Sequence, residues 1–537
     1  MPETNIVVNL KIISFEDDEK PPTSRAAGSN GGGLVSIKPV KYFKEDAALS
    51  ADTVTAEVEI NASSSTTARE GLDLVVVLDI SESMKDEDRI GAMKKAMHFV
   101  IRKLTPMDRL SICAFSNKAG RHSALRSVTP AAQGELIAVV DRLMAAGGTN
   151  IADGLSTALA VVKFRRYTKG RTANIFLMSD GRQSEGDATL VDAGDVPVYT
   201  FGFGKDADQE LLNKIARKSL GGTFSSVPDR TSLSIPFSQL LGGLLTIVAQ
   251  DVQLTLTPNK ADDDVDAINV SPGTDYTADT HPDTGVITIK FGTLFAGEGR
   301  RVVITLGLKE SKVTDEYDAT LAEAQHSYRV QGKLQKQTPQ DILILRTQSP
   351  SEAPGTGIKA RQLQAEMARR EHAQAIRAAR EEADKEQLDD ARYIIMDALN
   401  ALEDVVVNDG GKLVNGLRAE LQQLLRLMET LELYLAQGRA YALAAETSHG
   451  RQRYAAKGGV DTNGQDRTFN TQRMDEYLDQ ALKYDKNPGD PIRSADQDTQ
   501  EELKANPLSA IGPELAVYLQ NAIQALQAIE RIIAPST

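Results

Sequence analysis

Four short apolar runs without alternation divide residues 72–249, and amphipathic stretches separate them. The runs are 74–78, 110–115, 175–178 and 196–201. Apolar residues at helical spacing predict helices between and after these runs. The predicted helices cover 89–104, 131–144, 151–164, 207–219 and 232–249. Buried strands that alternate with helices are typical of a parallel sheet covered on both faces. We therefore expect 72–249 to form a doubly wound α/β domain with a mostly parallel sheet.

Alternating apolar and polar residues, typical of half-buried strands, lie on both sides of this region. The pattern covers 53–61 on one side, and 252–256, 286–290 and 302–306 on the other. A short sheet built from 34–71 alone would be marginally stable. We therefore expect 34–71 and 250–345 to join in one β-sandwich that carries the α/β domain as an insertion. The alternative is two small, separate β elements.

The last third of the chain, 355–537, is predicted to be helical. Helices are expected near 359–385 and 387–406, followed by two stripes of large apolar residues at helical spacing. These stripes contain Leu417, Leu421, Leu424, Met428, Leu431 and Leu435, and then Leu515, Leu519, Ile523, Leu526 and Ile529. Glycines and polar residues predict a loop at 449–470. We expect these helices to pack their own apolar faces together; a dedicated partner groove is the alternative.

Residues 1–33 are predicted as an N-terminal strand followed by a flexible linker rich in Pro, Ser and Gly. The first residues lack the basic and apolar regions of a secretory signal. The most apolar window, 240–248, is far shorter than the roughly 20 residues that span a bilayer. Cys113 is the single cysteine, so no intrachain disulfide can form, which favours a reducing compartment. We expect a soluble protein in the cytoplasm or elsewhere inside the cell.

The charge balance argues against one class of partner. Acidic residues outnumber basic ones by 75 to 61, which gives a net charge of −14. A general nucleic-acid binder should present a basic field instead. The net charge does not indicate the oligomeric state.

Oxygen-bearing side chains gather at the predicted strand ends of the α/β domain. Asp79, Ser81 and Ser83 follow the first buried strand, and Asp180 follows the third. Thr149 lies in a Gly-rich loop that leads into the helix at 151–164. The binding crevice of an open α/β sheet lies at the carboxyl ends of its strands. We therefore expect three loops to bring these five side chains to one edge of the sheet.

The chemistry of this set fits a hard cation. Two carboxylates and three hydroxyls, without sulfur or imidazole, favour Mg²⁺, with Mn²⁺ or Ca²⁺ as competitors. The two carboxylates neutralise the ion, and a carboxylate from a partner protein can replace one of its waters. We expect no catalytic residues and no organic cofactor. The alternative role for Asp79 and Asp180 is to cap nearby helices.

These residues carry a resemblance to a known family. Residues 72–248 resemble the von Willebrand factor type A domain, whose signature is Asp-x-Ser-x-Ser, then Thr in a Gly-rich loop, then Asp-Gly after a strand. The resemblance implies a metal-ion-dependent adhesion site in which Ser81, Ser83 and Thr149 bind the ion directly. It also implies that Asp79 and Asp180 often act through water. Glu82 stands where many relatives have Gly, and an extra acid there strengthens cation binding or repels an acidic partner.

The arrangement as a whole is similar to plant proteins that join such a domain to a β region and a C-terminal helical segment. The segments that carry this second resemblance are 438–443 and 448–453. Some of those relatives carry an N-terminal zinc-binding RING module and act as ubiquitin ligases. A single cysteine cannot build a Cys-rich zinc site, so we do not expect ligase activity from this chain.

Other motifs are weaker. The glycines of 202–207 fit a permissive dinucleotide-binding pattern, and a tight turn is the simpler interpretation. Asp262, Asp264 and Asp266 imitate a calcium loop, but its later positions do not fit. The six histidines are scattered, and no pair has metal-ligand spacing in the sequence.

These patterns together predict a non-enzymatic protein-interaction module that depends on a divalent cation. The first alternative is a component that recruits substrates to a ubiquitin-ligase type of complex without a RING module of its own. A minor alternative is a metal-dependent hydrolase that uses Asp79 and Asp180, although no general base is evident.

Overall fold

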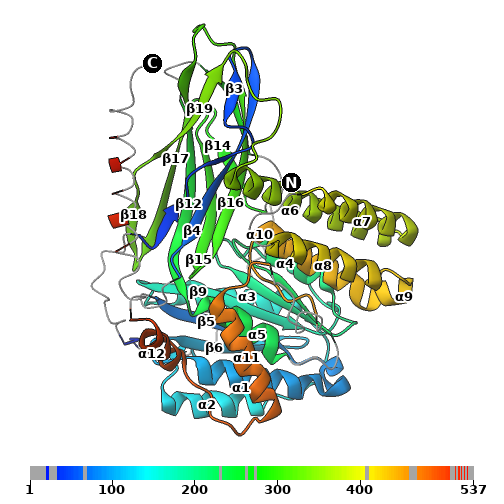
Figure 1. Ribbon diagram of the computed structural model, residues 1–537. Helices are drawn as coiled ribbons and strands as arrows, with labels where there is room; N and C mark the ends of the chain where they lie inside the picture. Colours follow the sequence, from blue (N-terminus) through cyan, green and yellow to red (C-terminus); the bar gives the residue numbers. More distant parts are fainter. Residues whose placement is uncertain are drawn as a thin grey trace, which may run out of the picture.

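The computed structural model describes residues 20–22, 33–64, 69–228, 233–259, 264–270, 275–405, 411–458 and 468–507, with single positions between 515 and 529. An α/β domain lies below a β-sandwich, and a helical arm projects to one side (Figure 1). The strand and linker predicted within 1–33 lie almost wholly outside the described residues. None of the helices in the described ranges has the combination of length and hydropathy that a bilayer span requires.

The α/β domain contains the mostly parallel sheet expected from its apolar runs. Five parallel strands have the order β11-β10-β9-β5-β6, and β7 and β8 pair antiparallel with β6 at one edge. The strands are β5 (Gly71–Asp79), β6 (Arg109–Phe115), β7 (Ala119–Arg121), β8 (Arg126–Ser127), β9 (Arg171–Ser179), β10 (Val198–Phe203) and β11 (Phe224–Val227). All nine positions of the central β5 are buried, because helices cover both faces of the sheet.

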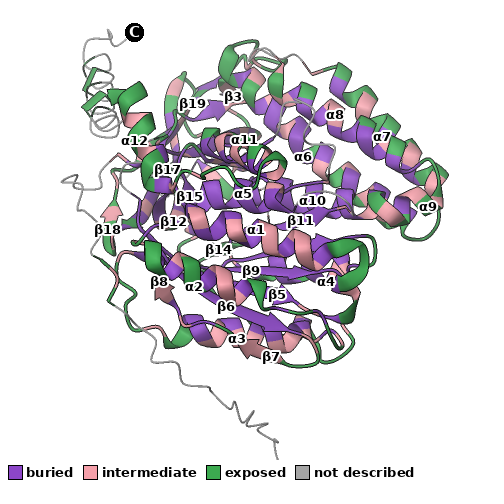
Figure 2. Cartoon of the chain, turned by 90° about the horizontal axis from the view of Figure 1, so that it is seen from below, coloured by how far each residue is buried: buried purple, intermediate pink, exposed green. Residues whose placement is uncertain are grey.

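Helices cover both faces of the sheet (Figure 2), and an apolar core lies between the helices and each face. One face packs on α1 (Arg89–Lys103), α2 (Pro130–Asp141) and α5 (Ser234–Leu244), and the other packs on α3 (Ile151–Phe164) and α4 (Gln209–Lys218). The predicted helix at 232–249 is too long, since α5 ends at Leu244 and a strand begins at Ile247. The apolar run crosses this boundary without a break, and periodicity alone does not separate a buried helix from a buried strand.

Strands from both sides of the α/β domain in the sequence share one sandwich. The first sheet contains β1 (Val35–Ile37), β2 (Lys41–Tyr42), β4 (Asp52–Ala62), β13 (Val265–Val270) and β16 (Gly299–Leu308). The second contains β3 (Asp46–Ala48), β12 (Ile247–Pro258), β14 (Ala278–Thr280), β15 (Ile287–Phe295), β17 (Tyr317–Val330), β18 (Lys333–Lys336) and β19 (Gln340–Thr347). Strand β4, which precedes the α/β domain in the sequence, pairs antiparallel with β16, which follows it. This pairing runs from Asn61 opposite Gly299 to Asp52 opposite Leu308. One apolar core lies between the two sheets.

The arm is built from α6 (Ile358–Ala383), α7 (Leu388–Glu403), α8 (Lys412–Leu427), α9 (Leu431–Leu433) and a π-turn at Tyr434–Gly438. The leucine stripe expected along one helix is therefore broken: α8 ends at Leu427, and Leu435 is exposed. The side chain of Thr430 starts a new helix there by accepting the backbone N–H of Leu433 at 3.1 Å, as an N-cap residue does.

The remaining helices leave the arm and pack on the α/β domain, contrary to the expectation that the helical region packs only on itself. Helix α10 (Arg439–Arg451) is buried along nearly its whole length between α4 and the arm. Helices α11 (Gln472–Lys486) and α12 (Ala495–Ala505) cover α5 and α1, and Met474 and Tyr477 join the core of the α/β domain.

The predicted loop at 449–470 begins too early, because α10 continues to Arg451. A helix that is buried on all sides has no polar face whose end would mark its boundary. Asp262 and Ile523 lie outside the described residues. The other members of the last predicted stripe are exposed, so they do not pack against other helices as expected: Leu515, Leu519, Leu526 and Ile529.

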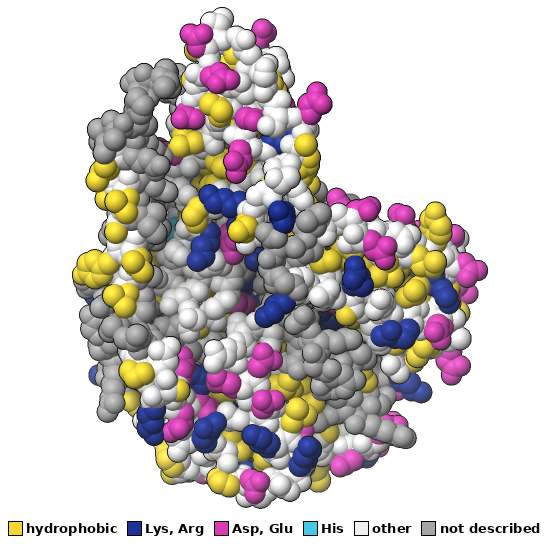
Figure 3. Space-filling model, in the orientation of Figure 1, with side chains coloured by type: hydrophobic (Ala, Val, Ile, Leu, Met, Phe, Trp, Pro, Cys, Tyr) yellow, Lys and Arg dark blue, Asp and Glu magenta, His cyan; other side chains and the backbone are white. Residues whose placement is uncertain are grey.

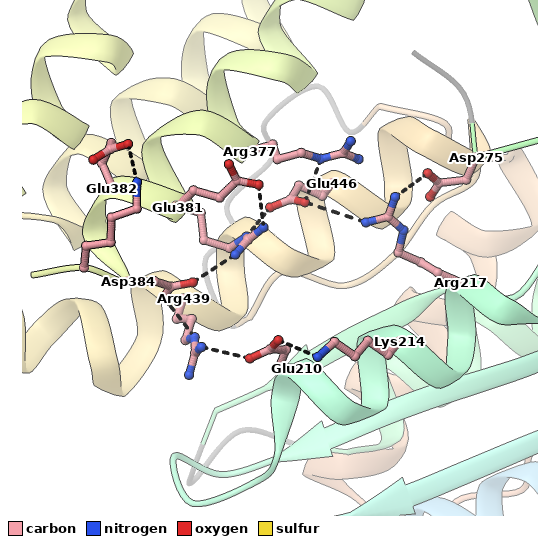
Figure 4. A network of polar contacts seen from close by, with 12 residues as sticks. Glu210, Lys214, Arg217, Asp275, Arg377, Glu381, Glu382, Asp384, Arg439 and Glu446 are labelled. Carbon is pink, nitrogen blue, oxygen red and sulfur yellow. Dashed lines mark hydrogen bonds and ion pairs between the residues drawn. The ribbon is translucent and has the colours of Figure 1, made fainter. Parts of the chain in front are cut away.

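A network of ion pairs joins α10, the arm and the α/β domain (Figure 4). Glu446 of α10 is fully buried and pairs with Arg380 and Arg377 of α6 and, at 3.9 Å, with Arg217 of α4. Arg439 at the start of α10 pairs with Glu210 of α4 at 3.1 Å. The arm is therefore fixed to the α/β domain through α4.

Candidate metal site

The five residues singled out in the sequence lie at the carboxyl edge of the α/β sheet. Asp79 is the last residue of β5, and Asp180 directly follows β9. These strands are neighbours and pair in register up to Leu78 opposite Met178, so the two carboxylates leave the sheet side by side. Both carboxylates are fully buried. Parallel pairing of adjacent strands is thus what brings together residues that are a hundred positions apart.

Hydrogen bonds fix the turn after β5. The backbone N–H of Ser81 donates to Asp79 Oδ1 at 2.8 Å, and the hydroxyl of Ser179 donates to Asp79 Oδ2 at 2.6 Å. The hydroxyls of Ser81 and Ser83 lie 3.0 Å apart, and Ser83 donates to Asp180 Oδ1 at 2.8 Å. The turn therefore presents its two hydroxyls toward the second carboxylate.

The Gly-rich loop adds Thr149 to this group. The backbone N–H of Glu82 donates to the carbonyl of Gly147 at 2.9 Å, which ties the loop to the turn after β5. Gly147 has a φ of +86°, a conformation that favours glycine, and a Cβ there would lie 2.4 Å from Asn117 Oδ1. Glycine at this position therefore lets the loop lie against Asn117, which follows β6.

Gly181, which directly follows Asp180, lies beside two of the hydroxyls. A Cβ added at Gly181 would lie 3.4 Å from the hydroxyl oxygens of both Ser83 and Thr149. The structure thus links all five side chains: hydrogen bonds join Asp79, Ser81, Ser83 and Asp180, and Thr149 lies next to Ser83 beside Gly181. Carboxylate and hydroxyl oxygens in this arrangement fit a Mg²⁺-like cation.

Burial sets the electrostatics of the pair of carboxylates. It raises the pKa of Asp79 to about 6, against hydrogen bonds from Ser179 and Ser81 that lower it, and the charge of Asp180 raises it further. Burial also raises the pKa of Asp180, although Arg89 and Ser83 oppose the shift. A divalent ion would relieve the cost of holding two negative charges here, which is the electrostatic condition for cation binding.

Arg89 is a part of the site that the sequence analysis missed. This first residue of α1 is buried and donates to Asp180 Oδ2 at 2.9 Å. Its other terminal nitrogen lies 3.6 Å from Asp206. A cation at a helix N-terminus is disfavoured by the helix dipole, so an arginine at that position is the signal that could have found it.

Glu82, the residue that departs from the family pattern, faces solvent. It is exposed and forms an ion pair with Lys85 at 2.5 Å. The positive charge of Lys85 therefore partly neutralises Glu82 at the edge of the site.

A second cluster joins residues that have no regular spacing in the sequence. His372 of α6 and His449 of α10 each place Nε2 within 3.0 Å of Glu420 Oε2, and Lys457 and Thr468 bind Oε1. The absence of spaced histidines in the sequence therefore did not exclude a pair in space. Arg369 donates toward His449 Nδ1 at 3.4 Å, so that nitrogen accepts and the proton lies on Nε2, facing Glu420. Both oxygens of Glu420 thereby accept hydrogen bonds from buried donors.

Comparisons with known proteins agree with this geometry. Residues 73–239 match the model of the von Willebrand factor type A domain, and residues 411–483 match a family described as VWA / Hh protein intein-like. The E3 ubiquitin-protein ligase WAV3 of Arabidopsis thaliana is 27% identical over 297 residues, which cover 52% of this chain and 36% of that protein. The probable E3 ubiquitin-protein ligase WAVH2 of the same plant is 29% identical over 260 residues, 45% of this chain and 33% of its own length. The chain spans about a third of the length of these two relatives.

A solved structure shares the fold. The von Willebrand factor type A protein from Catenulispora acidiphila aligns with a TM-score of 0.54 and 19% identity, over 79% of this chain and 98% of that chain. The sequence-based expectation of an α/β domain of this type, related to plant proteins, is confirmed. Residues 73–239 form a von Willebrand factor type A domain, and the chain is homologous to the Arabidopsis proteins over part of its length.

Proposed function

We propose that this chain binds a partner protein through a divalent cation, Mg²⁺ with Mn²⁺ or Ca²⁺ as competitors. The observation that supports the proposal is the grouping of oxygens at the candidate metal site: Ser83 and Thr149 meet beside Gly181, and Ser83 is hydrogen-bonded to Asp180 and Ser81. Asp79, Ser81, Ser83, Thr149 and Asp180 would hold the ion. When bound, the cation supplies a positive centre to which a carboxylate of the partner can bind. The proposed role is binding without catalysis.

The residues of the chain tune this centre. Asp79 and Asp180 contribute two negative charges, and the ion pair with Arg89 compensates one of them. The site therefore carries about one net negative charge and does not fully neutralise a divalent ion. An ion that keeps part of its charge attracts a carboxylate more strongly.

The arm borders the same edge of the sheet and would extend the binding surface. The backbone N–H of Asp208 donates to the carbonyl of Gly181 at 3.3 Å, and Asp208 caps α4. Glu210, two residues further, pairs with Arg439 at the base of the arm (Figure 4). A partner whose acidic side chain reaches the cation would thus lie close to the junction between α4 and the arm.

Affinity capture with and without chelator tests this proposal. Tagged wild-type chain should retain its partners in magnesium and release them in EDTA. The Asp79→Asn variant should behave in magnesium as the wild type does in EDTA, whereas Glu82→Gln at the rim should still capture them. Partners retained equally in all four conditions would contradict the proposal.

The similarity to proteins named as ubiquitin ligases favours a second candidate, a role in recruiting substrates to a ligase complex. This role does not require the cation, so a ligase component would bind away from the candidate metal site. Capture of ligase subunits that persists in EDTA and in the Asp79→Asn variant would support this role.

A further inference from the structure

A pocket rich in basic residues lies where the β-sandwich meets the start of α6. Its volume is about 350 Å³, and its charged lining consists of Lys38, Lys41, Glu59, Arg301, Lys359 and Arg361. These residues come from the first sheet of the sandwich and the first turns of α6. Figure 3 shows Lys and Arg side chains gathering on this face, between the sandwich and the arm. Five cations and one carboxylate are an unusual lining in a chain whose net charge is −14.

The inner cations have partners below the pocket. Lys41 is buried and pairs with Glu57 at 2.7 Å and with Glu59 at 2.5 Å. Arg301 lies 3.6 Å from Glu59 and 3.8 Å from Glu366. These glutamates pair with the cations of the floor and hold the floor of the pocket in place.

Two lysines at the rim carry positive charge without such balance. Lys38 and Lys359 are exposed, and neither forms an ion pair with any residue in the described ranges. Arg361 uses Nε to donate to the carbonyl of Thr356 at 2.7 Å, which fixes its guanidinium group at the mouth. Lys38 and Lys359 therefore leave positive charge at the mouth of the cavity.

The beginning of α6 adds to this charge. This 26-residue helix starts after Gly357 without a side-chain cap, and its first turn contains no acidic residue. Lys359 is its second residue and Arg361 its fourth. Helix N-termini are partially positive and favour acidic residues, so cations at these positions are unfavourable on their own. An anion in the pocket would offset both the helix dipole and the rim charges.

We propose that this pocket binds a phosphate group. A phosphate dianion offers several strong acceptor oxygens to Lys and Arg donors, and Arg binds it with paired hydrogen bonds. The cavity has room for one phosphate together with part of the molecule that carries it. The group can come from free phosphate or from a phosphorylated side chain of a protein, and the binding experiment distinguishes the two. This site is separate from the metal site and does not depend on the proposed function.

Calorimetric titration of the full chain with inorganic phosphate, at constant ionic strength and with EDTA present, tests the proposal. EDTA removes divalent cations, so the result is independent of metal binding. The wild type should bind one phosphate per chain. Lys38→Met combined with Lys359→Met should weaken binding about tenfold or more, because each lost charged hydrogen bond is worth roughly 1.5–3 kcal/mol.

A matched control uses two exposed lysines of β18 outside the pocket, Lys333→Met with Lys336→Met, which should bind phosphate as the wild type does. Both double variants change only exposed side chains, and equal melting temperatures confirm that they are folded. A phosphoserine peptide that displaces phosphate at a lower concentration than phosphate itself identifies a protein as the source of the group. Displacement only at equal concentration identifies free phosphate. No saturable binding to the wild type, or equal weakening in both double variants, would overturn the proposal.

Discussion

Arg89 and Asp180 form a buried ion pair at the centre of the candidate metal site, with Nη1 of the arginine 2.9 Å from Oδ2 of the aspartate. The other oxygen of Asp180 accepts the hydroxyl hydrogen of Ser83. The carboxylate is therefore shared between an internal cation and the position proposed for the metal. This sharing stabilises two buried carboxylates when no metal is bound, and it limits how strongly the site holds an ion.

Replacing Arg89 by Met should separate these two effects. The variant leaves buried negative charge without compensation, so we expect a loss of roughly 3–5 kcal/mol of stability in EDTA. Magnesium should restore part of this loss, so the increase in melting temperature on adding magnesium should be larger than in the wild type. Thermal unfolding in EDTA and in magnesium measures both quantities.

Lys85→Met is the matched control, since Lys85 pairs with the exposed Glu82 at the rim. Exposed pairs contribute about 0–1 kcal/mol, so its melting temperatures should stay close to those of the wild type. An Arg89→Met variant with an unchanged response to magnesium would place the cation away from Asp180.

Gly181→Ala should place a methyl group between the Ser83 and Thr149 hydroxyls without unfolding the domain. The new Cβ lies at ordinary contact distance from Ser83 and Thr149, and Gly181 is not among the glycines with positive φ. We expect a stability in EDTA equal to that of the wild type or higher by up to about 1 kcal/mol. The increase in melting temperature with magnesium should disappear. Gly134→Ala in α2, where a Cβ has open space, should retain that increase.

Glu446→Gln should loosen the attachment of the arm. The substitution removes the buried carboxylate that pairs with Arg380, Arg377 and Arg217 and leaves their charges without it. We expect a loss of roughly 3–5 kcal/mol in urea unfolding. Glu381→Gln, an exposed residue of the same network, should change stability by less than about 1 kcal/mol. Equal effects of the two substitutions would show that the arm is not anchored through Glu446.

Stability should fall in acid because of the cluster around Glu420. Burial lowers the pKa of His449 to about 4 from the ordinary 6.5, so the unfolded chain binds a proton at higher pH than the folded chain does. The folded state therefore loses stability as the pH falls from about 6.5 to about 4, by on the order of 3 kcal/mol. Burial opposes ionisation of Glu420, but Lys457 and the two histidines outweigh it and hold its pKa well below the usual range. This carboxylate adds a further loss of stability below its ordinary pKa of 4.5.

Urea unfolding across this pH range tests the assignment to His449. His449→Gln should be less stable near neutral pH, but its stability should fall less steeply in acid. His98→Gln, on the surface of α1, should keep the wild-type slope. A wild-type slope in the His449→Gln variant would assign the acid sensitivity to other groups.

Much of the α/β domain could be predicted because its signals are local. The apolar run of β5 ends at Asp79, and helix α3 has the bounds that its periodicity predicts. The convergence of Asp79 and Asp180 followed from one rule, that parallel strands bring their carboxyl ends to the same edge of a sheet. The site could thus be assembled from strand ends without knowledge of side-chain contacts.

Features that depend on contacts between distant segments could not be predicted. The pairing of His372 with His449 through Glu420 follows from how α6, α8 and α10 pack together, and no spacing in the sequence records it. Arg89 differs, because its place at the start of a helix was a signal in the sequence, although its partner Asp180 was not. The end of α5 was misplaced because buried helices and buried strands are equally apolar.

Calorimetric titration with magnesium of the wild type and of the Asp79→Asn variant tests the central claim most directly. We expect one cation per chain to bind the wild type, and binding to the variant to be at least about tenfold weaker, because a charged ligand is lost. Similar melting temperatures of the two proteins in EDTA would confirm that the variant is folded. Equal binding by both proteins, or no binding to the wild type at millimolar magnesium, would contradict the account.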